Sequence, residues 1–185
     1  MFKGTIDENL NKQSIKGSEV KKLREKIIET YPSIEKYLEE IWPKDAKVLK
    51  SKIKVEDYLV QVYLIDDEIR FMENRDKIVI PTMRILHQYP FMMPHMQCDK
   101  GAIKHILSGS DVMCPGLTSP GGKMENLERY QVVAITAEGK VNAMGIGITV
   151  MSTEEIIKKN KDVAIELIQN LNDGLWKLTR PAATL

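Results

Sequence analysis

The 185-residue sequence has only two cysteines, 6% aromatic residues and a formal net charge of +1. Two cysteines without a C-x-x-C pair do not form a disulfide framework, so we expect a reducing, cytoplasmic location. The near-neutral charge excludes a broad cationic coat, and any contact with nucleic acid must come from a local patch. The longest uncharged run, 85–98, contains two prolines and is too short to span a membrane. Because Lys3 and polar residues follow Phe2 directly, we also expect no secretory signal.

Signatures of catalysis and of cofactor binding are missing too. The sequence contains no P-loop, no G-x-G-x-x-G and no G-x-S-x-G, and its carboxylates are scattered among lysines. Cys98 and Cys114 stand in no local nucleophile signature, so we expect neither enzymatic activity nor a cofactor. His87, His95, Cys98 and His105 are residue types that bind zinc, but their spacing fits no ordinary finger. We therefore expect packed or solvent-facing histidines and no metal.

The stretch 99–121, DKGAIKHILSGSDVMCPGLTSPG, is the most informative part of the chain. Asp99 is a candidate helix N-cap, and apolar residues then recur at the three- and four-residue spacing of a short helix. Gly109 stands where a left-handed residue would end that helix. Lys100 and Lys104 are four residues apart and share the exposed face. A short strand and a Cys-Pro-Gly turn are predicted next, and the helix start with this glycine-rich corner could hold a phosphate.

Before this stretch, the pattern predicts helices followed by an antiparallel sheet. The expected elements are a polar arm over 4–17, helices after Ser18 and over 33–41, strands over 52–56, 59–65 and 69–72, and a helix from Pro81 to Pro90. The strand over 59–65 is apolar on both faces and should lie in the centre of the sheet. Residues 87–98, rich in proline and methionine, are expected to pack two domains together.

After this stretch, strands are predicted over 130–136, 141–151 and 163–167, with a capping box at Ser152 and Glu155. Gly145 and Gly147 fall on one face of the middle strand. They indicate either a barrel corner, which we favour, or a surface that a ligand approaches closely. Asn172–Gly174 reads as a turn, and a frayed tail is expected from Arg180 onward.

A run of basic residues lies on one side of the first helix. Its members are Lys21, Lys22, Arg24 and Lys26. Such a run is usually a solvated helix face, which is the interpretation that we favour. The alternative is a second contact with RNA, because clustered lysine and arginine provide phosphate affinity that is independent of sequence.

The order DKGAIKHILSG then DVMCPGL resembles the opening of a PUA domain, a small pseudobarrel that binds structured RNA. Extended by LTSPGGK and by LNDGLW at 171–176, it resembles the malignant T-cell-amplified sequence family of ribosome-associated translation factors. The likeness also includes MFK at the start, YPSIEKYL and PTMRILHQYPFMMPH. It implies an α+β fold, in which an amino-terminal domain with helices and an antiparallel sheet (1–92) precedes a PUA pseudobarrel (93–185).

The resemblance further implies a non-catalytic factor that binds RNA and the small ribosomal subunit. Its expected roles are reinitiation, non-canonical initiation and the removal of deacylated tRNA after termination, with density-regulated protein as the heterodimer partner. The RNA-facing candidates carried over are Lys100, Gly101, Lys104, Pro115, Gly116 and Leu117. The lysines would neutralise phosphates, Gly101 would allow a close approach, and 115–117 would offer an apolar ledge to an unpaired end such as the tRNA acceptor terminus. His105 replaces the aromatic ring usual in the family, so we expect it in the core.

Two other functions stay open at this point. The chain could be a protein-only adaptor whose PUA module does not bind RNA, or an accessory subunit of an RNA-modifying enzyme. In either case Lys100 and Lys104 would simply be solvated.

Overall fold

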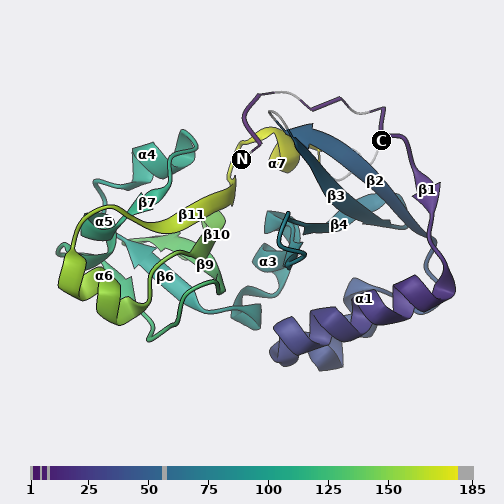
Figure 1. Ribbon diagram of the computed structural model, residues 1–185, viewed down its shortest axis with the longest axis horizontal. Coiled ribbons are helices and arrows are strands. Elements are labelled where there is room, and N and C mark those ends of the chain that lie inside the picture. Colours follow the sequence, from purple (N-terminus) through teal and green to yellow (C-terminus); the bar gives the residue numbers. More distant parts are fainter. Residues whose placement is uncertain (1, 5, 8, 56–57, 179–185) are drawn as a thin grey trace.

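The computed structural model describes residues 2–4, 6–7, 9–55 and 58–178 and contains two sheets, one in each half of the chain (Figure 1). The amino-terminal domain has a five-stranded antiparallel sheet in the order β1-β2-β3-β4-β5. The carboxyl-terminal domain has a six-stranded sheet in the order β7-β11-β10-β9-β6-β8, in which only the β6–β9 pair is parallel. The two sheets lie beside one another, and α3 and α7 lie between them (Figure 1).

The helices and strands follow the predicted order, with several short additions. In the amino-terminal domain they are β1 (Gln13–Ser14), α1 (Gly17–Thr30), a 3₁₀ helix (Pro32–Tyr37), α2 (Leu38–Ile41), β2 (Val48–Val55), β3 (Tyr58–Ile65), β4 (Glu68–Glu73), β5 (Val79–Pro81), α3 (Met83–Gln88) and a 3₁₀ turn (Pro90–Met92). In the carboxyl-terminal domain they are β6 (His95–Cys98), α4 (Ile103–Leu107), β7 (Val112–Met113), α5 (Cys114–Thr118), β8 (Lys123–Met124), β9 (Val132–Ala137), β10 (Gly145–Thr149), α6 (Thr153–Lys159), β11 (Val163–Asn170) and α7 (Gly174–Leu178).

The amino-terminal sheet follows from alternation and turn chemistry. Buried apolar residues of β2 alternate with lysines, and β3 lies between β2 and β4, so the predicted central strand is confirmed. Asp66 and Asp67 both adopt positive φ, as the two-residue turn of a hairpin requires. The polar arm expected over 4–17 is partly wrong, because β1 pairs with β2. The helix predicted over 33–41 is divided between a 3₁₀ helix and α2.

The glycines of β10 show how tightly the carboxyl-terminal sheet is packed. A Cβ atom on Gly147 would lie 2.4 Å from Cγ2 of Ile165 and 2.7 Å from the carbonyl oxygen of Glu166. The pairing of β10 with β11 shifts register between Ile146 and Gly147, and every residue of β10 is buried. These glycines therefore face closely packed atoms of β11 at an irregular part of the sheet. The ligand-facing interpretation is wrong, and the barrel corner stays a prediction.

The elements α6, β11 and α7 complete the carboxyl-terminal part of the described chain. The capping box of Ser152 and Glu155 at the start of α6 is confirmed, as is the strand predicted over 163–167, which lies within β11. The turn predicted at Asn172–Gly174 leads into α7, and the N–H of Gly174 donates to the carbonyl of Phe2 at 2.8 Å. The tail predicted from Arg180 lies outside the described residues.

Hydrogen bonds and a cation–π contact join the two domains. The N–H of Met83 donates to Oε1 of Gln169 at 2.9 Å, and Nε2 of His87 lies 2.8 Å from the carbonyl oxygen of Ala143. The guanidinium of Arg84 lies 4.0 Å from the ring centre of Trp176. The segment 87–98 is therefore more than a linker, because it ends in β6, a strand of the second sheet. The predicted division after residue 92 stays a prediction.

Candidate nucleic-acid interface

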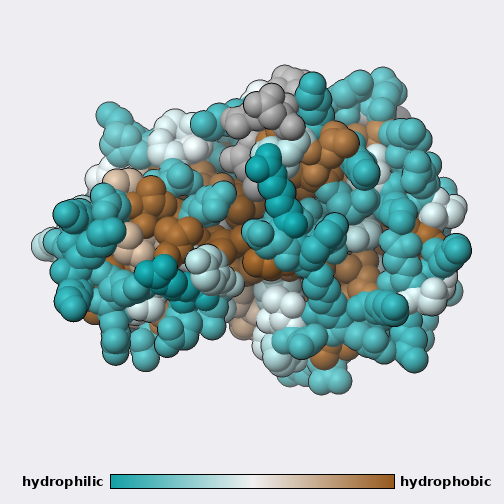
Figure 2. Space-filling view, viewed as in Figure 1, coloured by the Kyte–Doolittle hydropathy of each residue, from teal (hydrophilic) through white to brown (hydrophobic). Residues whose placement is uncertain are grey.

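A groove of about 550 Å³ lies on the carboxyl-terminal domain, between the α4 region and the start of α5. Its walls come from the turn after β6 and α4, the loop before β7 and β7 itself, α5 and the residue after it, and the start of β11. The lining residues are Asp99, Gly101, Ala102, His105, Ile106, Ser110, Asp111, Val112, Met113, Pro115, Gly116, Ser119 and Val163. Figure 2 shows hydrophobic residues gathered over the region of β7 and β11, surrounded by hydrophilic ones.

Local hydrogen bonds hold the walls of the groove together. Oδ1 of Asp99 accepts from the N–H of Ala102 at 2.8 Å in the turn before α4. The predicted N-cap at Asp99 is wrong, because the N-cap of α4 is Ala102 and no side chain caps this helix. The N–H of Asp99 donates to the carbonyl of Gly116 at 2.9 Å, so the two corners are bonded to each other. A Cβ atom on Gly116 would lie 3.2 Å from Cβ of Ala102, which explains why a small residue suits this contact. Gly109 has a φ of 91° after α4, as expected of a helix-ending glycine.

The structure brings together three of the predicted RNA-facing residues. Gly101, Pro115 and Gly116 all line the groove. Leu117 does not, because it is only 1% exposed and packs in the core of the domain. The predicted turn at 114–116 is instead the start of helix α5, on which Cys114 and Leu117 are three residues apart and both point inward. The apolar ledge expected at Leu117 is therefore wrong.

Both predicted lysines are exposed and lie beside residues that line the groove. Lys100 and Lys104 each precede a lining residue, Gly101 and His105, by one position. The Nζ atom of Lys100 lies 3.9 Å from Oε1 of Glu138, a distance at which an exposed ion pair contributes little. Lys104 forms no ion pair with any residue that the structure describes. Both ammonium groups can therefore meet a phosphate.

The sequence analysis did not identify one groove residue and assigned another to the core. Met113 is 47% exposed and lines the groove, so it supplies the apolar surface that was expected at Leu117. The core position expected for His105 is wrong, because this residue is exposed and also lines the groove. The spacing could have indicated this, since His105 follows Gly101 by four residues and shares its side of a helical segment.

The second cationic cluster is smaller than the sequence suggested. The guanidinium of Arg24 donates to the carbonyl of Trp42 and to Oε1 of Glu39, and the ammonium of Lys26 donates to the carbonyl of Lys77. These side chains anchor α1, so they are not free for RNA. The remaining two members of the run are Lys21, whose Nζ lies 3.9 Å from Oε1 of Glu25, and the exposed Lys22.

The cysteines and His95, considered above as possible nucleophiles or metal ligands, are buried or bonded within the protein. Burial raises the pKa of the Cys98 thiol to about 12, so it is not a thiolate near neutral pH. Burial also raises the pKa of Cys114, whose Sγ lies 3.0 Å from the carbonyl oxygen of Lys161. Nε2 of His95 lies 2.6 Å from the carbonyl oxygen of Pro90. Within the described residues, there is no group of three potential metal ligands and no helix long and apolar enough to cross a membrane.

Comparison with known proteins places this groove in a known domain. The model of the Pre-PUA-like domain matches residues 7–90, and that of the PUA domain matches residues 94–171. The α+β fold with a PUA sheet is therefore confirmed. A hypothetical protein of Pyrococcus horikoshii shares this fold with a TM-score of 0.70 and 22% identity, and the match covers 91% of this chain and 99% of that one. A PUA-domain protein of Aeropyrum pernix does so with a TM-score of 0.70 and 20% identity, over 92% and 91% of the two chains.

Closer relatives are found among proteins of known name. Malignant T-cell-amplified sequence 1 of Rattus norvegicus is 42% identical over 181 residues, which are 96% of this chain and 98% of the relative. Translation machinery-associated protein 20 of Saccharomyces cerevisiae is 40% identical over 183 residues, which are 97% and 99% of the two chains. The chain therefore belongs to the malignant T-cell-amplified sequence family.

Proposed function

We propose that this protein is a non-catalytic translation factor that binds RNA through the groove beside α4. The observation that carries the proposal is the position of two exposed lysines, Lys100 and Lys104, beside the largely apolar groove lined by Gly101, Pro115 and Met113. Phosphates require cations, whereas unpaired bases require an apolar or aromatic surface, and this site offers both. The name of the yeast relative, translation machinery-associated protein 20, supports a role in translation.

The geometry supports binding of an unpaired RNA end better than binding of a duplex. A groove of about 550 Å³ can hold one or two nucleotides but not a double helix. His105 offers a ring face and Met113 an apolar contact to a base, while the lysines meet the flanking phosphates. The ligand that we propose is the acceptor end of a tRNA held on the small ribosomal subunit. Lys21 and Lys22 on α1 would add a minor contact to ribosomal RNA.

The cellular role that we propose is translation reinitiation, non-canonical initiation and the removal of deacylated tRNA after termination. Density-regulated protein is the proposed heterodimer partner, and the cytoplasm is the proposed location. The absence of a catalytic step is part of the proposal, and the high pKa of the Cys98 thiol supports it.

A salt titration of RNA binding tests the proposal. The double variant Lys100→Ala/Lys104→Ala removes two phosphate contacts, so we expect weaker binding to deacylated tRNA. The slope of log K against log salt should flatten by about 1.4 to 1.8. The matched control is Lys52→Ala/Lys54→Ala, which removes two exposed charges from β2 in the other domain.

Fluorescence anisotropy with labelled tRNA measures the slope, and cosedimentation with small subunits at several salt concentrations checks it on the ribosome. Equal slopes for wild-type protein and the α4 variant would mean that the groove does not bind RNA. A protein-only adaptor would then be the better description of the chain.

A further inference from the structure

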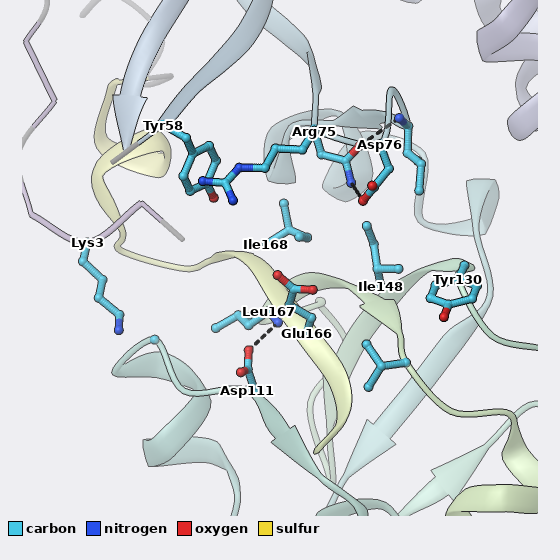
Figure 3. A pocket seen from close by; sticks show the side chains of 14 residues that line it. Lys3, Tyr58, Arg75, Asp76, Asp111, Tyr130, Ile148, Glu166, Leu167 and Ile168 are labelled. Carbon is cyan, nitrogen blue, oxygen red and sulfur yellow. Dashed lines mark hydrogen bonds between the residues drawn. The ribbon is translucent and has the colours of Figure 1, made fainter. Parts of the chain in front are cut away.

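A second cavity, of about 770 Å³, lies between the two domains and shares Asp111, but no other lining residue, with the proposed RNA groove. Tyr58 and the loop 74–78 form one wall, and β10, β11 and Asp111 form the other (Figure 3). Lys3 reaches the rim from the amino terminus. A further cavity of about 550 Å³ shares Asp76, Ile78 and Tyr130 with the first, so the two lie next to each other along the domain boundary and are together called the cleft.

Tyr130 stands where the two cavities meet, and its conformation is unusual. Its φ is 64°, a left-handed value that a bulky residue rarely adopts, and the residue is 68% exposed. The backbone is held in place, since the N–H of Tyr130 donates to the carbonyl of Thr149 at 2.7 Å and the N–H of Gln131 donates to Oγ1 of Thr149 at 3.0 Å. A strained residue that presents a large ring to solvent is a feature typical of binding sites.

The two opposite walls of the cleft carry different functional groups. The guanidinium of Arg75 lies 3.6 Å from the ring centre of Tyr58, which gives one wall a flat, cationic surface. On the facing wall, Glu166 and Asp111 point into the cleft (Figure 3). Oδ1 of Asp111 accepts from the N–H of Leu167 at 2.8 Å, but neither carboxylate pairs with a cation in the described part of the chain. The facing wall therefore lacks counter-charges that a ligand could supply.

We propose that this cleft binds an extended peptide segment of a partner protein that carries basic side chains. Successive side chains of an extended peptide point to opposite sides, so one set would meet Glu166 and Asp111 while the other meets Tyr130 and the Arg75–Tyr58 pair. The exposed Glu166 carboxylate, which does not line the RNA groove, repels RNA phosphates and attracts lysine or arginine, which favours a peptide over a nucleic acid. The occupant would touch both domains and hold them in one relative position. This inference does not depend on RNA binding by the groove.

A selection from displayed random heptapeptides tests the proposal on the full chain. We expect wild-type protein to enrich sequences with lysine or arginine at alternate positions. The variant Glu166→Lys should lose affinity for the enriched peptides by about tenfold or more, because a rim carboxylate is replaced by a like charge. The matched control Glu154→Lys makes the same change on α6, outside the cleft, and should bind as wild type does.

Charge exchange distinguishes a specific site from general attraction. The enriched peptide resynthesised with glutamate in place of its basic residues should bind Glu166→Lys better than it binds wild type, as measured by fluorescence anisotropy. Enrichment without basic residues, equal affinity of Glu166→Lys and wild type, or protection of Tyr130 and Glu166 by a single-stranded RNA heptamer rather than by the peptide would each overturn the proposal. None of these outcomes would change the salt slopes that test the RNA groove.

Discussion

Replacing Gly147 by alanine tests the conclusion that β10 needs glycine for packing. The added methyl carbon would lie 2.4 Å from a methyl group of Ile165 and 2.7 Å from the carbonyl oxygen of Glu166. The side chain of Ile165 is fully buried and the oxygen belongs to the backbone of β11, so neither can move without shifting the strand. Overpacking of this kind costs about 1–3 kcal/mol. For a chain of this size, about 2 kcal/mol lowers the melting temperature by roughly 4–8 °C.

Thermal unfolding followed by circular dichroism measures this effect, and two further glycines provide a graded series. The nearest neighbours of a Cβ atom on Gly145 would lie at 3.0 Å, so Gly145→Ala should show a smaller loss. Gly17 at the start of α1 has nothing within 4 Å, and Gly17→Ala should leave stability unchanged or slightly raised. A Gly147→Ala protein that melts with the wild type would show that β11 can move aside, and the packing explanation would be wrong.

Two other predictions concern charged side chains outside the groove. A hydrogen bond from Arg129, with a smaller contribution from Ser152, lowers the pKa of Glu155 to about 2, below its usual value near 4.3. The pair therefore stabilises the fold above about pH 4.3 and loses this effect as the pH falls through 2. The melting temperature of Glu155→Gln should differ most from that of wild type at pH 7 and least near pH 2. A difference in melting temperature that does not depend on pH would contradict this. On α1, Arg24→Ala should lower the melting temperature because it removes bonds to Trp42 and Glu39, whereas Lys22→Ala should leave it unchanged. Equal melting temperatures for these two variants would show that the Arg24 contacts are not structural.

Much of the fold could be predicted from local patterns. The two-residue alternation in β2 and the three- and four-residue spacing in α1 follow from the geometry of strands and helices, and each needs only neighbouring residues. The capping box at Ser152 and the hydrogen bond from the N–H of Ala102 to Asp99 are equally local, because the bonded groups lie within three residues of each other. Membership of the family could be recognised for the same reason, since motifs such as DVMCPGL and LNDGLW are read from neighbouring residues alone.

The candidate site was predicted only in part, because exposure depends on what packs against each face. Pro115 and Leu117 are two residues apart on α5, yet one lines the groove and the other fills the core. Arg24 and Lys22 look alike in a basic run, but only Arg24 faces acceptors on the segment that follows. No pattern within a helix of five residues states which side a neighbouring element will cover.

The sequence by itself therefore determined the family, the order of helices and strands and the stretch that carries the candidate RNA site. Only the tertiary structure decided that Met113 and His105 belong to the groove, that Leu117 does not, and that a cleft lined by Glu166 and Asp111 lies between the domains. The physical reason is distance along the chain. Helix and strand patterns arise from residues a few positions apart, whereas burial and pairing of charge arise from contacts such as that of Asp99 with Gly116, which only folding brings together.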